Sequence, residues 1–126
     1  MDQKIKVAVI GTGALGKHHA RIYAEMADEG LIDCVGVYDQ NVAAAKEVAG
    51  KHRIPVLQSM EEATEKAHAL SIVTPTITHF TIANELLGKG KHLLVEKPMT
   101  DNTDQAQCLV ELAREKDCVL QIGHVE

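Results

Sequence analysis

Aromatic residues are almost missing from this 126-residue sequence, which contains no Trp, two Tyr and one Phe. Its hydrophobic core must therefore be built from Val, Ile, Leu and Ala. No apolar run approaches the roughly 20 residues that a membrane-spanning helix needs. The formal net charge is −5 and no basic stripe is present. This argues against a nucleic acid partner, because binding phosphates requires clustered Lys and Arg.

Cysteine is also scarce, and Cys34, Cys108 and Cys118 are the only three. They are odd in number and lie in apolar segments, which predicts small buried side chains in a reducing compartment. The sequence has no C-x-x-C motif, so we expect no zinc or redox site and no bound metal. The N-terminus leads directly into a strand pattern without a signal peptide, and we therefore expect a cytoplasmic protein.

What the sequence does contain is a regular alternation of strand and helix patterns. The expected strands are 6–11, 33–39, 55–57, 70–73, 92–95 and 119–122, and the expected helices are 14–28, 42–52, a short one opening at Ser59, 77–87 capped by Gly88, and 104–116. The strands are near-continuous apolar runs, which is typical of a parallel sheet covered on both faces. We predict one α/β domain over residues 1–126, a three-layer, doubly wound parallel sheet (Rossmann fold) with strand order 3-2-1-4-5-6. Within it, Leu15, Ile22, Tyr23 and Met26 are expected on the inner face of the first helix.

The first strand leads straight into a G-x-G-x-x-G loop, and a helical pattern follows. Gly11 permits the tight turn, Gly13 lets the backbone approach a pyrophosphate, and Gly16 lets the helix pack closely on the strand. The second strand ends on Asp39, whose carboxylate suits a ribose 2′-hydroxyl and repels a 2′-phosphate. A structural alternative is that Asp39 caps the next helix. The pattern predicts a dinucleotide site formed by Gly11, Thr12, Gly13, Ala14, Leu15, Gly16 and Asp39, with NAD preferred over NADP.

Polar residues also follow the later strands, where the carboxyl ends of a parallel sheet meet. They are Thr74, Pro75, Thr76 and His79 after the fourth strand, Glu96, Lys97 and Pro98 after the fifth, and His124 after the sixth. We expect these residues where a nicotinamide and its substrate would lie. The structural alternatives are a solvated lysine at 97 and helix-start or terminal histidines at 79 and 124. Of His18 and His19, one is expected to face solvent and the other to pack.

The segments VIGTGALGKHHA, VTPTITH and VEKPMT, together with Asp39, resemble the glucose-fructose oxidoreductase / inositol 2-dehydrogenase (Gfo/Idh/MocA) family. The resemblance covers essentially the whole chain, as that family's N-terminal NAD-binding domain. The glycine loop is shared with many dehydrogenases, whereas Glu96-Lys97-Pro98 after the fifth strand is much more specific. The terminal IGHVE resembles the branch that acts on sugar nucleotides and N-acetylated sugars.

The resemblance implies an oxidoreductase that transfers hydride between NAD and a secondary alcohol of a sugar, sugar nucleotide or polyol. It implies that Lys97 contacts the nicotinamide and the reacting hydroxyl, and that the peptide before Pro98 is often cis. The family's second domain binds substrate and supplies an Asp and His acid–base pair, and we expect that domain to be absent from this chain. The chain alone should then bind cofactor without turnover, and the longer parent is expected to be a homo-oligomer.

Two other functions remain open from the residues alone. A non-catalytic, nicotinamide-sensing regulator would use the same fold, but it would tend to lose Lys97. A methyltransferase has a similar glycine loop and an acid after the second strand, but it has no use for Glu-Lys-Pro after the fifth.

Overall fold

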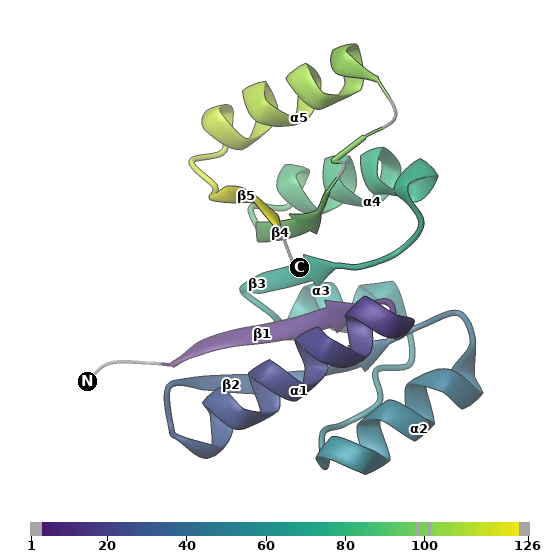
Figure 1. The fold of residues 1–126 in the computed structure, drawn as a ribbon. Helices are drawn as coiled ribbons and strands as arrows, with labels where there is room; N and C mark the ends of the chain where they lie inside the picture. Colours follow the sequence, from purple (N-terminus) through teal and green to yellow (C-terminus); the bar gives the residue numbers. More distant parts are fainter. Residues whose placement is uncertain (1–3, 98, 101, 124–126) are drawn as a thin grey trace.

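A single parallel sheet forms the centre of the molecule. The computed structural model describes residues 4–97, 99–100 and 102–123. Its sheet has five strands in the order β2-β1-β3-β4-β5, all parallel (Figure 1). They are β1 (Ile5–Ile10), β2 (Ile32–Tyr38), β3 (Ala69–Ile72), β4 (His92–Glu96) and β5 (Leu120–Gly123). The order reverses between β1 and β3, so the carboxyl ends of these two strands flank the point where ligands bind in such sheets.

The predicted fold class is confirmed, but one of the six predicted strands is absent from the described sheet. Residues 55–57 form only an isolated parallel bridge, in which Val56 pairs with Val37 beside β2. Its two backbone hydrogen bonds run from Val37 N–H to Pro55 O and from Leu57 N–H to Val37 O. Pro55 has no N–H, so the ladder cannot extend through it. The segment occupies the place predicted for strand three, and the remaining strands follow the predicted order.

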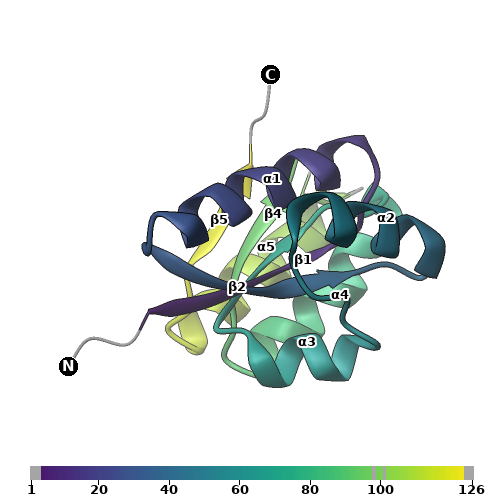
Figure 2. The same ribbon diagram turned by 90° about the horizontal axis from the view of Figure 1, so that it is seen from below.

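The helices lie in two layers, one on each face of the sheet (Figure 2). They are α1 (Ala14–Asp28), α2 (Val42–His52), α3 (Met60–Lys66), α4 (Thr76–Gly88) and α5 (Thr103–Glu115). Val9 and Val37 pack with α1 and α2 on one face, while Ile10 and Ile72 pack with α3, α4 and α5 on the other. The buried hydrophobic residues are all aliphatic, as expected, and Tyr23, Tyr38 and Phe80 are only partly buried.

The inner face of α1 differs from the prediction. Leu15 and Ile22 are 42% and 37% exposed, whereas Gly16, His19, Ala20 and Ala24 are buried. Small residues line the contact because they let the helix lie close to the sheet. The histidine prediction is correct, because His19 packs inside and the ring of His18 lies toward the surface, next to Arg21.

Two smaller expectations are also wrong. Cys108 is exposed on α5, and Cys34 and Cys118 are only partly buried. Gly88 is the last residue of α4 rather than its cap, and the left-handed glycine that follows the helix is Gly90, with φ of 79°. The chain turns there because the N–H of Gly90 donates to the carbonyl of Leu87 and that of Lys91 donates to the carbonyl of Leu86.

Candidate functional site

Gly11 and Gly16 shape the loop between β1 and α1. Gly11 has φ of 105°, and a Cβ placed on it would lie 2.2 Å from the carbonyl oxygen of Val73. A Cβ on Gly16 would lie 2.1 Å from the carbonyl oxygen of Gly11. The N–H of Gly11 donates to the carbonyl of Tyr38 at 2.8 Å, which fixes the loop to the end of β2. Neither glycine can be replaced without moving backbone atoms.

Gly13 differs from both, because a Cβ there would meet nothing within 4 Å. It is the N-cap of α1, no side chain caps that end, and the first turn carries no acidic residue. The first N–H groups of a helix have no partner within the helix, and they favour an anion in front of them. The open space at Gly13 is therefore where a phosphate can approach the backbone, and a pyrophosphate fits this part of the loop.

Asp39 follows β2 and is hydrogen-bonded to the glycine loop. Its Oδ2 atom accepts from both the N–H and the hydroxyl of the buried Thr12, each at 2.8 Å, and its Oδ1 atom accepts from the N–H of Asn41. Burial raises the pKa of Asp39, but the hydrogen bonds from Asn41 and Thr12 outweigh it and hold the pKa below its usual value. The carboxylate stays ionised at neutral pH. The N-cap of α2 is Asn41, so the alternative role of Asp39 as that cap is wrong.

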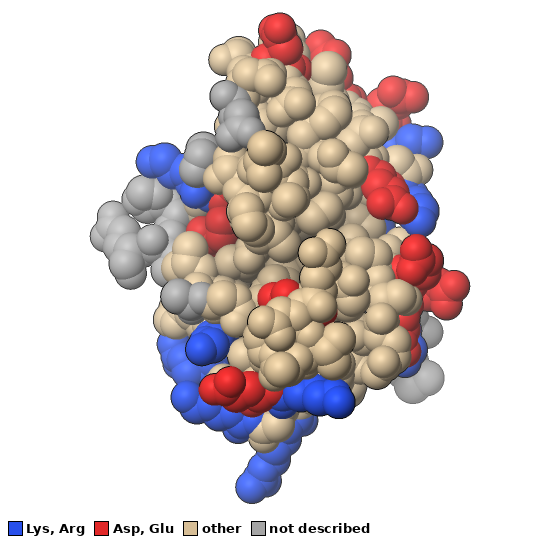
Figure 3. Space-filling view, turned by 90° about the vertical axis from the view of Figure 1, so that its right-hand side faces the viewer, with Lys and Arg blue, Asp and Glu red and all other residues tan. Residues whose placement is uncertain are grey.

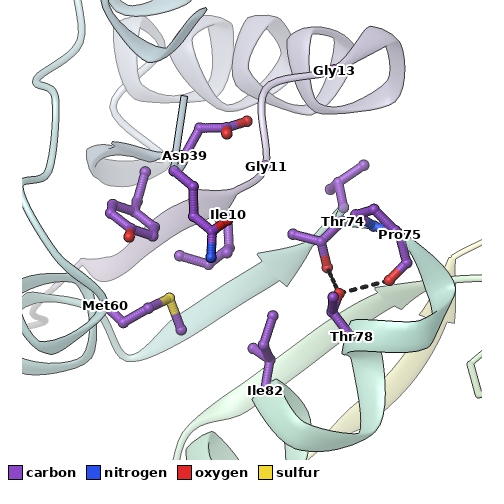
Figure 4. A pocket seen from close by; sticks show the side chains of 12 residues that line it. Ile10, Gly11, Gly13, Asp39, Met60, Thr74, Pro75, Thr78 and Ile82 are labelled. Carbon is purple, nitrogen blue, oxygen red and sulfur yellow. Dashed lines mark hydrogen bonds between the residues drawn. The ribbon is translucent and has the colours of Figure 1, made fainter. Parts of the chain in front are cut away.

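A cavity of about 470 Å³ opens in front of Gly11 and Asp39. The side chains around it come from the glycine loop, the end of β2 and the start of α4, with Met60 and Ile82 forming an apolar wall (Figure 4). Figure 3 looks onto this edge of the sheet, where the surface is hollowed and carries little charge. An apolar slot ending at a carboxylate is suited to an adenine ring with its ribose.

A second cavity, of about 360 Å³, adjoins the first and shares Gly13, Val73, Thr74 and Pro75 with it. It brings together most of the predicted polar residues. Its lining is Gly13, Leu15, Val73, Thr74, Pro75, Thr76, His79, Glu96 and Lys97. Lys97 is exposed and lies directly after β4, whereas Pro98 and His124 fall outside the described residues. The two cavities together follow the carboxyl edge of the sheet.

His79 and its neighbours hold the loop between β3 and α4. The ring of His79 is buried, with Nε2 at 2.8 Å from the carbonyl oxygen of Thr74 and Nδ1 at 3.0 Å from that of Met99. The hydroxyl of Thr78 donates to the carbonyl of Pro75 and accepts from the hydroxyl of Thr74. These contacts give His79 a structural role, in that it ties together the two loops that border the second cavity.

Sequence reasoning missed the partner of Glu96. The Glu96 carboxylate is only 6% exposed, and its Oε1 atom lies 2.8 Å from Nε2 of His19 on α1. The two residues are far apart in the chain, and no local spacing connects them. The one available signal was the expectation that one histidine of the His18-His19 pair packs inward.

The sequence matches the family model described as "Oxidoreductase family, NAD-binding Rossmann fold" (GFO_IDH_MocA) over residues 5–124. This match spans nearly the whole chain and includes both the glycine loop and the Glu96-Lys97 segment. The chain belongs to this family.

Individual members of the Gfo/Idh/MocA family are similar along the whole chain. UDP-N-acetylglucosamine 3-dehydrogenase from Acidithiobacillus ferrooxidans is 39% identical over 97% of this chain and 37% of its own length. Its solved structure has a TM-score of 0.87, covering 95% of this chain and 38% of that one. The scyllo-inositol 2-dehydrogenase (NAD(+)) of Bacillus subtilis is 29% identical over 98% of this chain and 36% of its own length. GenD2 from gentamicin A biosynthesis, solved in complex with NAD, has a TM-score of 0.87 at 29% identity, over 98% of this chain and 35% of that one.

The chain thus spans a little over a third of the length of these relatives. Its membership of the Gfo/Idh/MocA family supports a nicotinamide dinucleotide as its cofactor. Within the part of the chain that the structure describes, no helix has the length and apolar character needed to cross a membrane.

Proposed function

We propose that this chain is the NAD-binding domain of a dehydrogenase that oxidises a secondary alcohol of a sugar, sugar nucleotide or polyol, or reduces the matching ketone. The proposal rests on one observation. The glycine loop, Asp39 and Lys97 line two adjoining cavities at the same edge of the sheet. The names of the relatives, which include dehydrogenases of a sugar nucleotide and of inositol, support the substrate class.

The two cavities suggest how the dinucleotide lies. The adenosine half would occupy the larger cavity, with its ribose at Asp39, and the pyrophosphate would face Gly13 and the start of α1. The nicotinamide half would then reach the cavity lined by Glu96 and Lys97. A nicotinamide held there would supply the hydride-transfer chemistry of the proposed reaction.

We further propose that NAD is preferred over NADP. The ionised Asp39 would accept a hydrogen bond from a ribose 2′-hydroxyl and repel a 2′-phosphate. Gln40 and Asn41 follow it, and neither can pair with a phosphate as Arg or Lys would. The double change Asp39→Ser with Gln40→Arg should shift the ratio of dissociation constants toward NADP, as measured by fluorescence titration with NADH and NADPH. A wild-type chain that binds NADPH more tightly than NADH would refute the preference.

We propose that Lys97 contacts the reacting hydroxyl of the substrate during the chemical step. The ammonium group of an exposed lysine at this position can stabilise the alkoxide that develops as hydride leaves the neighbouring carbon. Because that charge appears mainly in the transition state, Lys97→Ala in an active enzyme that contains this domain should lower turnover by about a hundred- to a thousandfold and change the NAD dissociation constant only a few-fold. Lys97→Arg should rescue little, because a guanidinium does not release its proton. Near-normal turnover of Lys97→Ala would remove this assignment.

The three cysteines are free thiols, which supports a reducing compartment such as the cytoplasm. The homo-oligomeric state expected of the longer protein stays a prediction.

A further inference from the structure

Two polar side chains are buried together on the α1 side of the sheet. His19 and Glu96 are each 6% exposed, and Nε2 of His19 lies 2.8 Å from Oε1 of Glu96. A carboxylate can only accept a hydrogen bond, so the Nε2 atom of His19 carries the hydrogen. A buried carboxylate without such a donor is strongly disfavoured, and the pair therefore holds its geometry as a unit.

The surroundings leave both groups little room to move. Glu96 pairs in register with Gly123 of β5, and a Cβ on Gly123 would lie 2.6 Å from Oε1 of Glu96. The carboxylate therefore lies directly over Gly123, and a side chain at position 123 would press on it. On the other side, the ring of Tyr23 meets the ring of His19 edge-on at 6.3 Å, and the Tyr23 hydroxyl is hydrogen-bonded to Ser71 of β3 at 2.6 Å.

The pair connects two parts of the proposed site. His19 is on α1, the helix whose first turn faces the space at Gly13, and Glu96 is the last residue of β4. Lys97 comes next, and Glu96 and Lys97 both line the smaller cavity. Any shift of the Glu96 side chain would change the wall of that cavity and the start of the segment that carries Lys97.

We propose that His19 is a positioning residue: by holding Glu96 it fixes the end of β4, and with it Lys97, so that the nicotinamide half of the site is formed before cofactor binds. This inference rests on the proposed function and adds to it a residue outside the cavities that are assigned to the cofactor. A site formed in advance loses less free energy to ordering when the ligand arrives.

The test compares the dissociation constants of NADH and ADP-ribose, two ligands that share the adenosine half. NADH fills both halves of the site, whereas ADP-ribose lacks the nicotinamide. We expect His19→Leu in the 126-residue chain to raise the NADH dissociation constant about tenfold and to leave that of ADP-ribose within about twofold. His19→Gln keeps an N–H donor and should restore most of the difference. Glu96→Gln keeps the side-chain shape and an oxygen that can accept from the Nε2–H of His19, so it should lower NADH affinity less than His19→Leu does.

His18 provides the matched control. It precedes His19 on the same helix, but its ring lies toward solvent beside Arg21, so His18→Leu should change neither affinity. A second readout is independent of affinity: the His19 Nε2–H proton should give a downfield NMR signal that moves upfield in Glu96→Gln, where the acceptor is uncharged and the hydrogen bond weaker. Thermal unfolding of each variant monitors folding.

The outcomes separate this inference from the proposed function. Equal loss of NADH and ADP-ribose affinity in His19→Leu, or unchanged NADH affinity in that variant, would overturn the positioning role. Failure of the wild-type chain to bind both NADH and ADP-ribose would overturn the proposed function instead.

Discussion

Gly13 and Gly16 belong to one glycine motif, yet a side chain has opposite consequences at the two positions. Space is open around Gly13, whereas a Cβ on Gly16 would overlap the backbone of Gly11. The glycine pattern in the sequence predicts this difference, because Gly13 is expected to leave room for a pyrophosphate and Gly16 to let the helix pack closely. The difference separates the part of the motif that maintains the fold from the part that leaves room for a ligand.

We expect Gly13→Val to change the free energy of unfolding by no more than about 1 kcal/mol, the usual cost of losing a glycine N-cap. The same change should weaken NADH binding by about tenfold or more, because the side chain fills the space facing the pyrophosphate. Gly16→Ala should instead cost about 3 kcal/mol, through overpacking against Gly11. Urea unfolding and NADH titration of both variants test this. Unaltered NADH affinity in a folded Gly13→Val chain would contradict the role given to Gly13.

Asp39 makes a pH-dependent contribution to stability. Burial raises its pKa, but the hydrogen bonds from Asn41 and Thr12 outweigh burial and lower the pKa in the folded chain from 3.8, so protonation favours the unfolded state. The contribution of Asp39 to the free energy of unfolding is therefore complete above the pKa that Asp39 has in the unfolded chain. It is lost as the pH falls through the lower pKa that Asp39 has in the folded chain. In urea unfolding between about pH 6 and pH 2, the stability advantage of the wild-type chain over Asp39→Asn should shrink below about pH 4. An advantage that grows as the solution is acidified would show that the hydrogen bonds to Thr12 and Asn41 do not favour the charged form.

Among single residues, those that belong to a short sequence pattern could be predicted from the sequence. Gly11, Gly13, Gly16 and Asp39 stand at spacings that follow from one strand, one turn and one helix. The His19–Glu96 pair joins elements separated by most of the chain, so no local pattern could indicate it.

Strands and helices were largely predictable because buried parallel strands are continuous apolar runs. The prediction of a strand at 55–57 is wrong because the segment has the composition of a strand, while Pro55 lacks the N–H that a longer ladder needs. The prediction for the inner face of α1 is wrong because large apolar residues suggest burial, whereas here the small Gly16, Ala20 and Ala24 face the sheet.

The end of α4 allows a test with two glycines. Gly88 is helical, and a Cβ placed on it would meet nothing within 4 Å, whereas Gly90 has φ of 79°. Gly88→Ala should therefore stabilise the chain by about 0.5–1 kcal/mol, because alanine loses less backbone entropy in a helix. Gly90→Ala should destabilise it by about 1 kcal/mol, because alanine is strained at positive φ. Thermal or urea unfolding measures the stability change of each variant. Equal effects of Gly88→Ala and Gly90→Ala would show that α4 does not end between these two glycines.

At the scale of the whole molecule, the five strands bring the glycine loop, Asp39 and Lys97 to one edge of the sheet, although they are spread along most of the sequence. The fold class predicted this convergence, because a doubly wound sheet gathers the carboxyl ends of its strands. What the sequence could not predict is the shape of the larger cavity, since the side chains of Met60 and Ile82 form a wall that depends on tertiary packing.

The 126-residue chain spans 37% of the length of the UDP-N-acetylglucosamine 3-dehydrogenase that it resembles. We expect it to bind cofactor and to turn over no substrate, because catalysis also requires groups that hold the alcohol and exchange its proton. Absorbance at 340 nm with NAD and a panel of sugars and polyols is the measurement. Steady formation of NADH by the purified chain would show that the 126 residues alone are sufficient for catalysis.

Binding of a nicotinamide dinucleotide along this edge of the sheet can be tested by titrating the ¹⁵N-labelled chain with NADH and following its amide NMR signals. We expect saturable shifts of Gly11–Gly16, Gln40 and Asn41, Thr74 and Thr78, and Glu96 and Lys97. The shallow hollow on the outer face of α5, at Gln107 and Glu111, should not respond. Shifts confined to α5, or no saturable shift at the glycine loop, would show that the cofactor does not bind at this edge of the sheet.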